Sequence, residues 1–117
     1  MAAATRLLVL AIGMAFAVYA QTPAVADGGV LNGASFAKGQ AVTPGSLISI
    51  FGSNLATTSA TADSIPLSTS LANVSVTIGG IQAPLVGVFH SATNGDQINA
   101  QLPWDVNIQS GTTQVVV

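Results

Sequence analysis

The chain has 117 residues, enough for one domain, and only six carry a formal charge: Arg6, Asp27, Lys38, Asp63, Asp96 and Asp105. With two basic residues it lacks the cations that neutralise nucleic-acid phosphates or anionic lipids, so neither partner is expected. The absence of cysteine excludes disulfides, thiolate metal sites and a cysteine nucleophile.

Residues 1–26 have the pattern of an export signal. Arg6 precedes an uncharged stretch of apolar and small residues from Leu7 to Ala20. A membrane-spanning helix needs about 20 residues, whereas a shorter stretch is typical of a signal peptide. Small residues at the third and first positions before a cut place cleavage after Ala20 or after Ala26. We therefore expect a signal-peptide helix, then a domain at 27–117 that is secreted, periplasmic or on the cell surface, with a retained anchor as the alternative.

The first part of the mature chain contains an alternating strand. Ile48 and Ile50 are separated by Ser49, and this period of two predicts a half-buried strand. Before it, residues 30–36 predict a first edge strand and residues 37–43 a surface connection. Turn residues flank the alternating strand on both sides, because Gly and Asn tolerate a positive φ: Pro44 and Gly45 before it, and Gly52, Ser53 and Asn54 after it.

A second alternating region follows a long loop. Residues 56–73 are rich in Ala, Thr, Ser and Asp, which bury little apolar surface, so a loop is expected there. Leu71 marks the return to the core. From Val74 to Ile78 apolar residues again occupy every second position, which predicts a strand with Val74, Val76 and Ile78 facing inward.

A hairpin is predicted next. Gly79 and Gly80 suit a tight turn, and residues 81–89 form the return strand, in which Pro84 indicates a sheet edge. Asn94 and Gly95 predict the following turn.

The last part of the chain alternates strictly. In residues 97–102, Ile98, Ala100 and Leu102 are expected to face the core, and three amide side chains, those of Gln97, Asn99 and Gln101, to face outward. Residues 112–117 predict a final apolar strand. Because the chain stops within that strand, we expect the domain to be truncated or a fragment of a longer protein.

Six or seven short strands separated by turn residues predict an all-β fold, an immunoglobulin-like antiparallel β-sandwich. A parallel sheet would need crossover helices, and no segment of the mature sequence has the period of an amphipathic helix.

Five short motifs occur in order along the mature chain: Asn32-Gly33-Ala34-Ser35-Phe36, Pro44-Gly45-Ser46, Phe51-Gly52-Ser53-Asn54-Leu55, Ala83-Pro84-Leu85 and Gln97-Ile98-Asn99-Ala100-Gln101-Leu102-Pro103-Trp104. The strands and turns at residues 48–55, 74–80 and 98–103 and the final valine strand resemble the IPT/TIG immunoglobulin-like domain. The five motifs more narrowly resemble an uncharacterised domain found near the C-termini of large exported acidobacterial proteins. The resemblance covers residues 30–117 and implies the fold and export, but no reaction and no catalytic residue. In this chain the domain follows the signal peptide almost directly, and the segment from His90 to Asp96 is longer than in the family pattern.

Two sets of residues are candidates for chemistry. His90, Ser91 and Asp96 are the residue types of an acyl-transfer triad, but they lie within one short loop, where neighbouring side chains are not expected to converge. A solvated loop histidine is therefore preferred over a small hydrolase. The possible calcium donors lack an Asp-x-Asp-x-Asp-Gly loop, so a turn is preferred and no metal or cofactor is expected; these donors are Asp63, Asn94, Asp96 and Asp105.

The amide row beside Trp104 is the candidate binding site. An indole can stack on a sugar ring while Gln97, Asn99 and Gln101 bond its hydroxyls, which would make a carbohydrate-binding module. The alternatives are an ordinary solvent-exposed strand face and a Trp that covers the core.

We predict a non-catalytic exported module with a structural, adhesive or protein-interaction role. Its partner would be a protein or a cell-surface polysaccharide, with no membrane contact after signal cleavage. Self-association through the apolar edge strand at 113–117 is a further expectation.

Overall fold

The computed structural model describes residues 22–106 and 115–117. The expected signal-peptide helix and the cleavage position after Ala20 lie outside these residues, as do residues 112–114 of the expected last strand. Within them the fold is all-β, with eight strands and no helix, and the predicted antiparallel sandwich is confirmed. No part of the described chain forms a helix of the length and apolarity that crossing a membrane requires.

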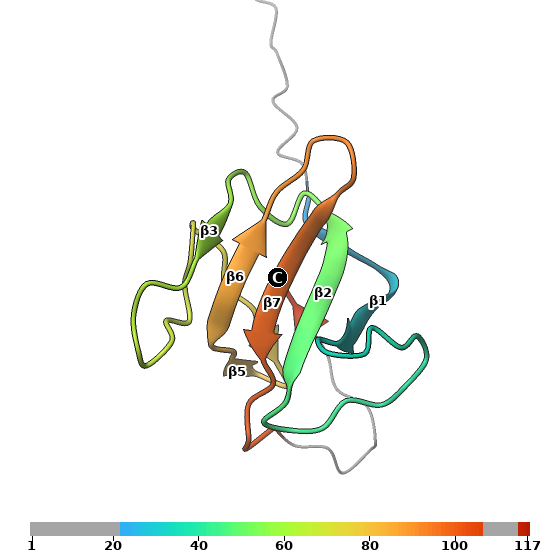
Figure 1. The fold of residues 1–117 in the computed structure, drawn as a ribbon, viewed down its shortest axis with the longest axis vertical. Helices are drawn as coiled ribbons and strands as arrows, with labels where there is room; N and C mark the ends of the chain where they lie inside the picture. Colours follow the sequence, from blue (N-terminus) through green and yellow to red (C-terminus); the bar gives the residue numbers. More distant parts are fainter. Residues whose placement is uncertain (1–21, 107–114) are drawn as a thin grey trace, which may run out of the picture.

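The strands form two antiparallel sheets (Figure 1). The larger has the order β1-β2-β7-β6-β3 and the smaller the order β5-β4-β8. Their bounds are β1 (Ala24–Asn32), β2 (Leu47–Ser53), β3 (Ala60–Thr61), β4 (Thr77–Ile78), β5 (Ile81–Gln82), β6 (Leu85–Phe89), β7 (Asp96–Gln101) and β8 (Val115–Val116).

One hydrophobic core lies between the sheets. The predicted inward positions are confirmed, because Ile98, Ala100 and Leu102 are buried on one side and Val76 and Ile78 on the other. These side chains belong to one cluster, which Val115 and Val117 join from the C-terminal end. Burial of this apolar surface is the main favourable term in the folding of a chain with no disulfide.

Strand β2 differs from its prediction in one respect. Ile48 and Ile50 face the core as expected, but Ser49 on the opposite face is also buried, at 1% exposure. Its hydroxyl donates a hydrogen bond of 2.8 Å to Asn99 Oδ1 on β7. The strand is therefore not half-buried at this position, because β2 lies inside the sheet and a cross-strand partner replaces water for the hydroxyl.

The first strand begins and ends earlier in the sequence than predicted. It runs from Ala24 to Asn32 instead of over residues 30–36, although it does form an edge of the sheet. Residues 33–35 form a turn, in which Asn32 Oδ1 accepts hydrogen bonds from Ala34 N and Ser35 N. This local bonding by an Asn side chain ends the strand.

The predicted return strand over 81–89 is two strands that belong to different sheets. Ile81 and Gln82 pair with β4, whereas Leu85 onward pairs with β7. The crossing occurs at Pro84, which has no amide hydrogen to continue a ladder but whose carbonyl accepts a bond from Gln101 N.

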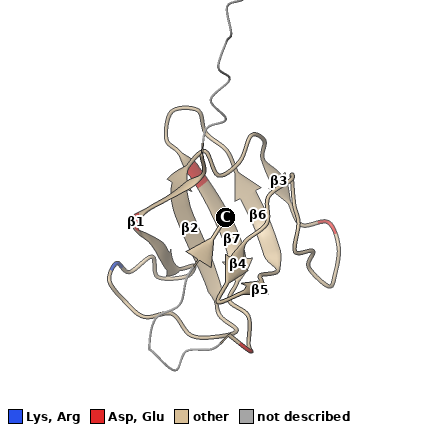
Figure 2. Cartoon of the chain, turned by 180° about the vertical axis from the view of Figure 1, so that it is seen from behind, with Lys and Arg blue, Asp and Glu red and all other residues tan. Residues whose placement is uncertain are grey.

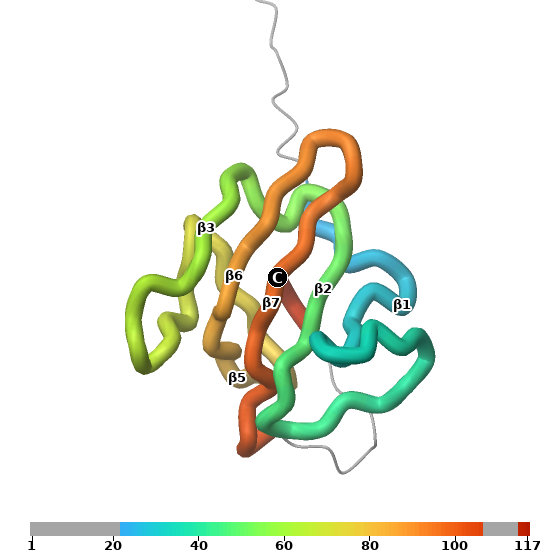
Figure 3. Tube along the Cα trace, in the orientation of Figure 1, coloured from blue at the N-terminus to red at the C-terminus, as the bar shows by residue number. Residues whose placement is uncertain are grey.

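The predicted loop over 56–73 is mostly irregular, but it contains β3, which pairs with β6 at the sheet edge (Figure 3). Leu71 packs against the core, as expected.

The turn residues have the following places. Gly79 and Gly80 join β4 to β5, both with positive φ, which is the type I′ geometry of two-residue hairpins. Asn94 lies in the β6–β7 turn and Gly95, with a φ of 80°, directly follows it, and Asn54 has a φ of 56° after β2. The prediction that Gly52 is a turn residue is wrong, because Gly52 lies within β2 and pairs with Val25 and Asp96.

Candidate binding face

The three predicted amides lie in one row on the outer face of the larger sheet, the face opposite the core. Gln97, Asn99 and Gln101 alternate along β7 with the buried residues Ile98 and Ala100 and are partly exposed. Residues directly opposite in antiparallel strands share a face. Gln97 is therefore flanked by Phe51 and Phe89, Asn99 by Ser49 and Gly87, and Gln101 by Leu47.

Two of the amides are bonded to each other. Gln97 Nε2 donates to Asn99 Oδ1 at 2.9 Å, and the same oxygen accepts the Ser49 hydroxyl. These bonds fix the orientation of the Asn99 side chain in the middle of the sheet. A ligand on this face would meet a preorganised amide instead of a freely rotating one.

The third amide is connected to the tryptophan through a turn. Gln101 Nε2 donates to the carbonyl oxygen of Gly45 at 3.2 Å, and the indole ring of Trp104 lies directly against the Cα of Gly45. Gly45 has a φ of 84°, and a Cβ at this position would overlap the ring. Trp104 is 76% exposed and therefore does not cover the core.

The four predicted binding residues therefore form two linked pairs, Gln97 with Asn99 and Gln101 with Trp104. The structure adds apolar residues that the sequence did not single out. Leu47 is 53% exposed and Phe89 40% exposed, and both flank the amide row. Their strand positions opposite Gln101 and Gln97 could have been found only with the register, which the sequence does not contain.

The charged residues of the described chain do not lie on this face of β2, β7 and β6. Lys38, Asp63 and Asp105 are in loops, and Asp27 is in the edge strand β1. Figure 2 shows that most of the segments coloured for charge are loops. Asp96 begins β7 but is buried, at 4% exposure. The outer face thus combines amides and apolar side chains without formal charge.

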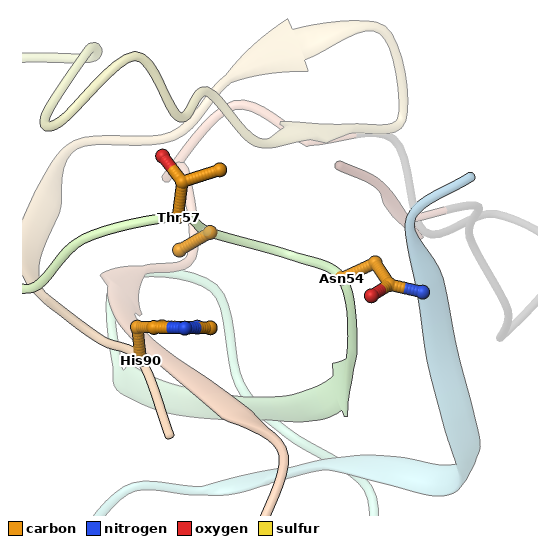
Figure 4. Close-up of a pocket in the computed structure, with 4 residues that line it drawn as sticks. Asn54, Thr57 and His90 are labelled. Atoms are coloured by element: carbon orange, nitrogen blue, oxygen red, sulfur yellow. The ribbon is translucent and has the colours of Figure 1, made fainter. Parts of the chain in front are cut away.

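The histidine and aspartate of the β6–β7 loop do converge, contrary to the prediction. His90 Nδ1 lies 2.7 Å from Asp96 Oδ1, because the hairpin brings the end of β6 beside the start of β7. The imidazole borders a hollow of about 470 Å³ that is also lined by Asn54, Ala56 and Thr57 (Figure 4). Because an ionised Asp96 only accepts hydrogen bonds, Nδ1 carries the hydrogen of this bond.

Asp96 accepts three more hydrogen bonds from backbone amides. Leu55 N and Ala56 N donate to Oδ2 at 2.8 and 3.0 Å, and Ser91 N donates to Oδ1 at 3.2 Å. Burial alone would raise the pKa of Asp96, but the hydrogen bonds from Ala56, His90, Ser91 and Leu55 outweigh it and hold the pKa below its usual value. The carboxylate ties the segment after β2 to the β6–β7 hairpin.

The remaining triad residue points elsewhere. Ser91 Oγ lies 3.4 Å from Thr93 Oγ1 and accepts a hydrogen bond from Asn94 N, so it is part of the turn. The described residues contain no group of three or more His, Asp or Glu side chains placed to hold a metal ion. Among the calcium candidates, the buried Asp96 has protein donors on both carboxylate oxygens.

Comparisons with known proteins found no matching family model, no similar curated protein and no similar solved structure.

Proposed function

We propose that this chain is an exported, non-catalytic module of the IPT/TIG immunoglobulin-like type with an adhesive or protein-interaction role at the cell surface. The observation that carries the proposal is the outer face of β2, β7 and β6. It presents fixed amides between exposed apolar side chains and bears no formal charge. Apolar side chains with a few placed polar groups are typical of recognition surfaces.

The absence of a catalytic role is part of the proposal. Both carboxylate oxygens of Asp96 accept hydrogen bonds, as expected for a structural residue that connects two loops. The neighbouring hydroxyl of Ser91 is engaged in its own turn and is not bonded to His90. A hydroxyl nucleophile needs a bond to its base, so this arrangement favours a binding module over a small hydrolase.

Substitution on the outer face provides the test. In Phe89→Lys a charge enters the flank of the amide row, whereas in Ile65→Lys the same charge enters a loop at a side chain that is 96% exposed. We expect labelled wild type and Ile65→Lys to bind intact cells of the producing organism in flow cytometry, and Phe89→Lys to lose binding. Equal binding by both variants would remove the outer face from the proposal, and no binding by wild type would remove the adhesive role.

Carbohydrate binding is the second candidate, and the exposure of Trp104 favours it. The ring is held on Gly45 beside the site where Gln101 is bonded, so an aromatic platform lies next to an amide. Glycan-array binding that disappears in Trp104→Ala but survives in His90→Ala would support this candidate. Hydrolysis of a simple ester that is lost in His90→Ala would instead support the hydrolase.

Self-association through an edge strand belongs to the same proposal. β8 lies at the edge of the smaller sheet, and its Val116 is 49% exposed. Strand edges with few charges pair readily with other chains. Sedimentation analysis over a range of concentrations tests this, with Val116→Lys expected to abolish any dimer.

A further inference from the structure

The edge strand β1 is interrupted by a bulge. Val25 pairs with Gly52 and Val30 with Ile50, so four residues of β1, 26–29, lie opposite Phe51 alone. Gly28 has a φ of 65°, and a Cβ on Gly29 would lie 2.5 Å from the carbonyl oxygen of Phe51. The two consecutive glycines therefore permit a bulge that other residues would not, and bulges commonly lie beside binding sites.

Beside this bulge is a pocket of about 390 Å³ with apolar walls. Leu31, which is 7% exposed, lines it together with Phe51 and Phe36. The rings of Phe36 and Phe51 have centroids 6.1 Å apart and planes inclined at 56°. Phe36 is 47% exposed and has a φ of 53°, a conformation that is costly for a bulky residue and often found at binding sites.

Two opposite charges line the same pocket. Asp27 comes from the bulge, and Lys38 comes from the loop that follows Phe36. Among the described residues Lys38 is within 4.0 Å of no carboxylate, so the two groups do not neutralise each other by direct contact. Both are exposed and can accept a ligand without a large desolvation cost.

We propose that this bulge pocket binds a free amino acid with a large apolar side chain. The pocket volume is within the range of about 300–1,000 Å³ found for small-molecule sites. The ligand side chain packs on Leu31, Phe36 and Phe51, Lys38 binds the α-carboxylate and Asp27 binds the α-ammonium. This site borders the outer face, because Phe51 of β2 belongs to both, but none of the three amides of β7 lines it. It requires export cleavage upstream of Ala24, where β1 begins.

The test is a titration of the exported protein with L-phenylalanine and L-leucine. Binding is measured from the amide chemical shifts in ¹H–¹⁵N NMR spectra. We expect shifts that saturate at Gly28, Gly29 and Lys38. The N-acetyl and carboxamide derivatives, which lack one charge each, should bind about two- to fivefold more weakly, as exposed ion pairs contribute modestly. A derivative that binds as tightly as the free amino acid would overturn the role of the corresponding charged residue.

Matched variants make the assignment specific. Lys38→Ala and Asp27→Asn replace exposed side chains and should leave the fold intact, while each weakens binding by the same two- to fivefold factor. Asp105→Asn removes an exposed charge that does not line this pocket and should bind as wild type does. Absence of any saturable shift with wild type, or equal weakening in Asp105→Asn, would overturn the proposal.

Discussion

The imidazole of His90 is held 2.7 Å from the buried carboxylate of Asp96, which also accepts backbone amides from the segment after β2. This one carboxylate therefore joins two loops at the same end of the larger sheet. Loss of this carboxylate should lower the stability of the whole domain, because a buried backbone amide left without its acceptor costs free energy.

Asp96→Asn should lower the free energy of unfolding by about 2–4 kcal/mol, since an amide has one acceptor oxygen and no charge. Urea denaturation monitored by circular dichroism measures this loss. The exposed Asp105 supplies the control, and Asp105→Asn should be within about 0.5 kcal/mol of wild type. Similar urea midpoints for Asp96→Asn and wild type would show that the hydrogen bonds to the Asp96 carboxylate contribute nothing to the stability of the domain.

The stability of the domain should fall in acid. The pKa of Asp96 is depressed in the folded state, so its contribution is fully present above the unfolded pKa of about 3.8 and is lost as pH falls through the folded pKa. Urea midpoints measured between pH 7 and pH 2 should therefore decrease below about pH 4. In Asp96→Asn this decrease should be smaller, and an unchanged pH profile in that variant would assign the acid sensitivity to other carboxylates.

Gly45→Ala should move the Trp104 ring as well as strain the backbone. A Cβ at Gly45 overlaps the indole, and its φ of 84° disfavours any side chain. Gly80 has the same φ but no atom within 4 Å of an added Cβ, so Gly80→Ala measures the strain alone. Both variants should lose about 1 kcal/mol or more, but only Gly45→Ala should change the fluorescence of the single tryptophan.

Export cleavage should occur after Ala20. β1 begins at Ala24, and Ala24 and Val25 pair with Ser53 and Gly52, so cleavage after Ala26 would remove the first part of this ladder. Mass spectrometry of the exported protein should give Gln21 as the first residue. A mature chain beginning at Asp27 would contradict this prediction and would also remove part of the bulge pocket.

The sequence by itself determined the all-β class, the inward positions of Ile98, Ala100 and Leu102 and the hairpin at Gly79-Gly80. These features depend on alternation and on backbone φ, which are properties of neighbouring residues. It also placed Gln97, Asn99 and Gln101 on the outer face, because a period of two separates the faces of a strand.

Only the tertiary structure decided which residues from different strands meet. The bond from Ser49 to Asn99, the contact of Trp104 with Gly45 and the bulge opposite Phe51 all depend on the register between strands. The split of residues 81–89 between two sheets has the same origin, because a sheet change at Pro84 becomes visible only when the partners of each strand are known. Alternation fixes the face of a side chain, whereas long-range pairing fixes its neighbours.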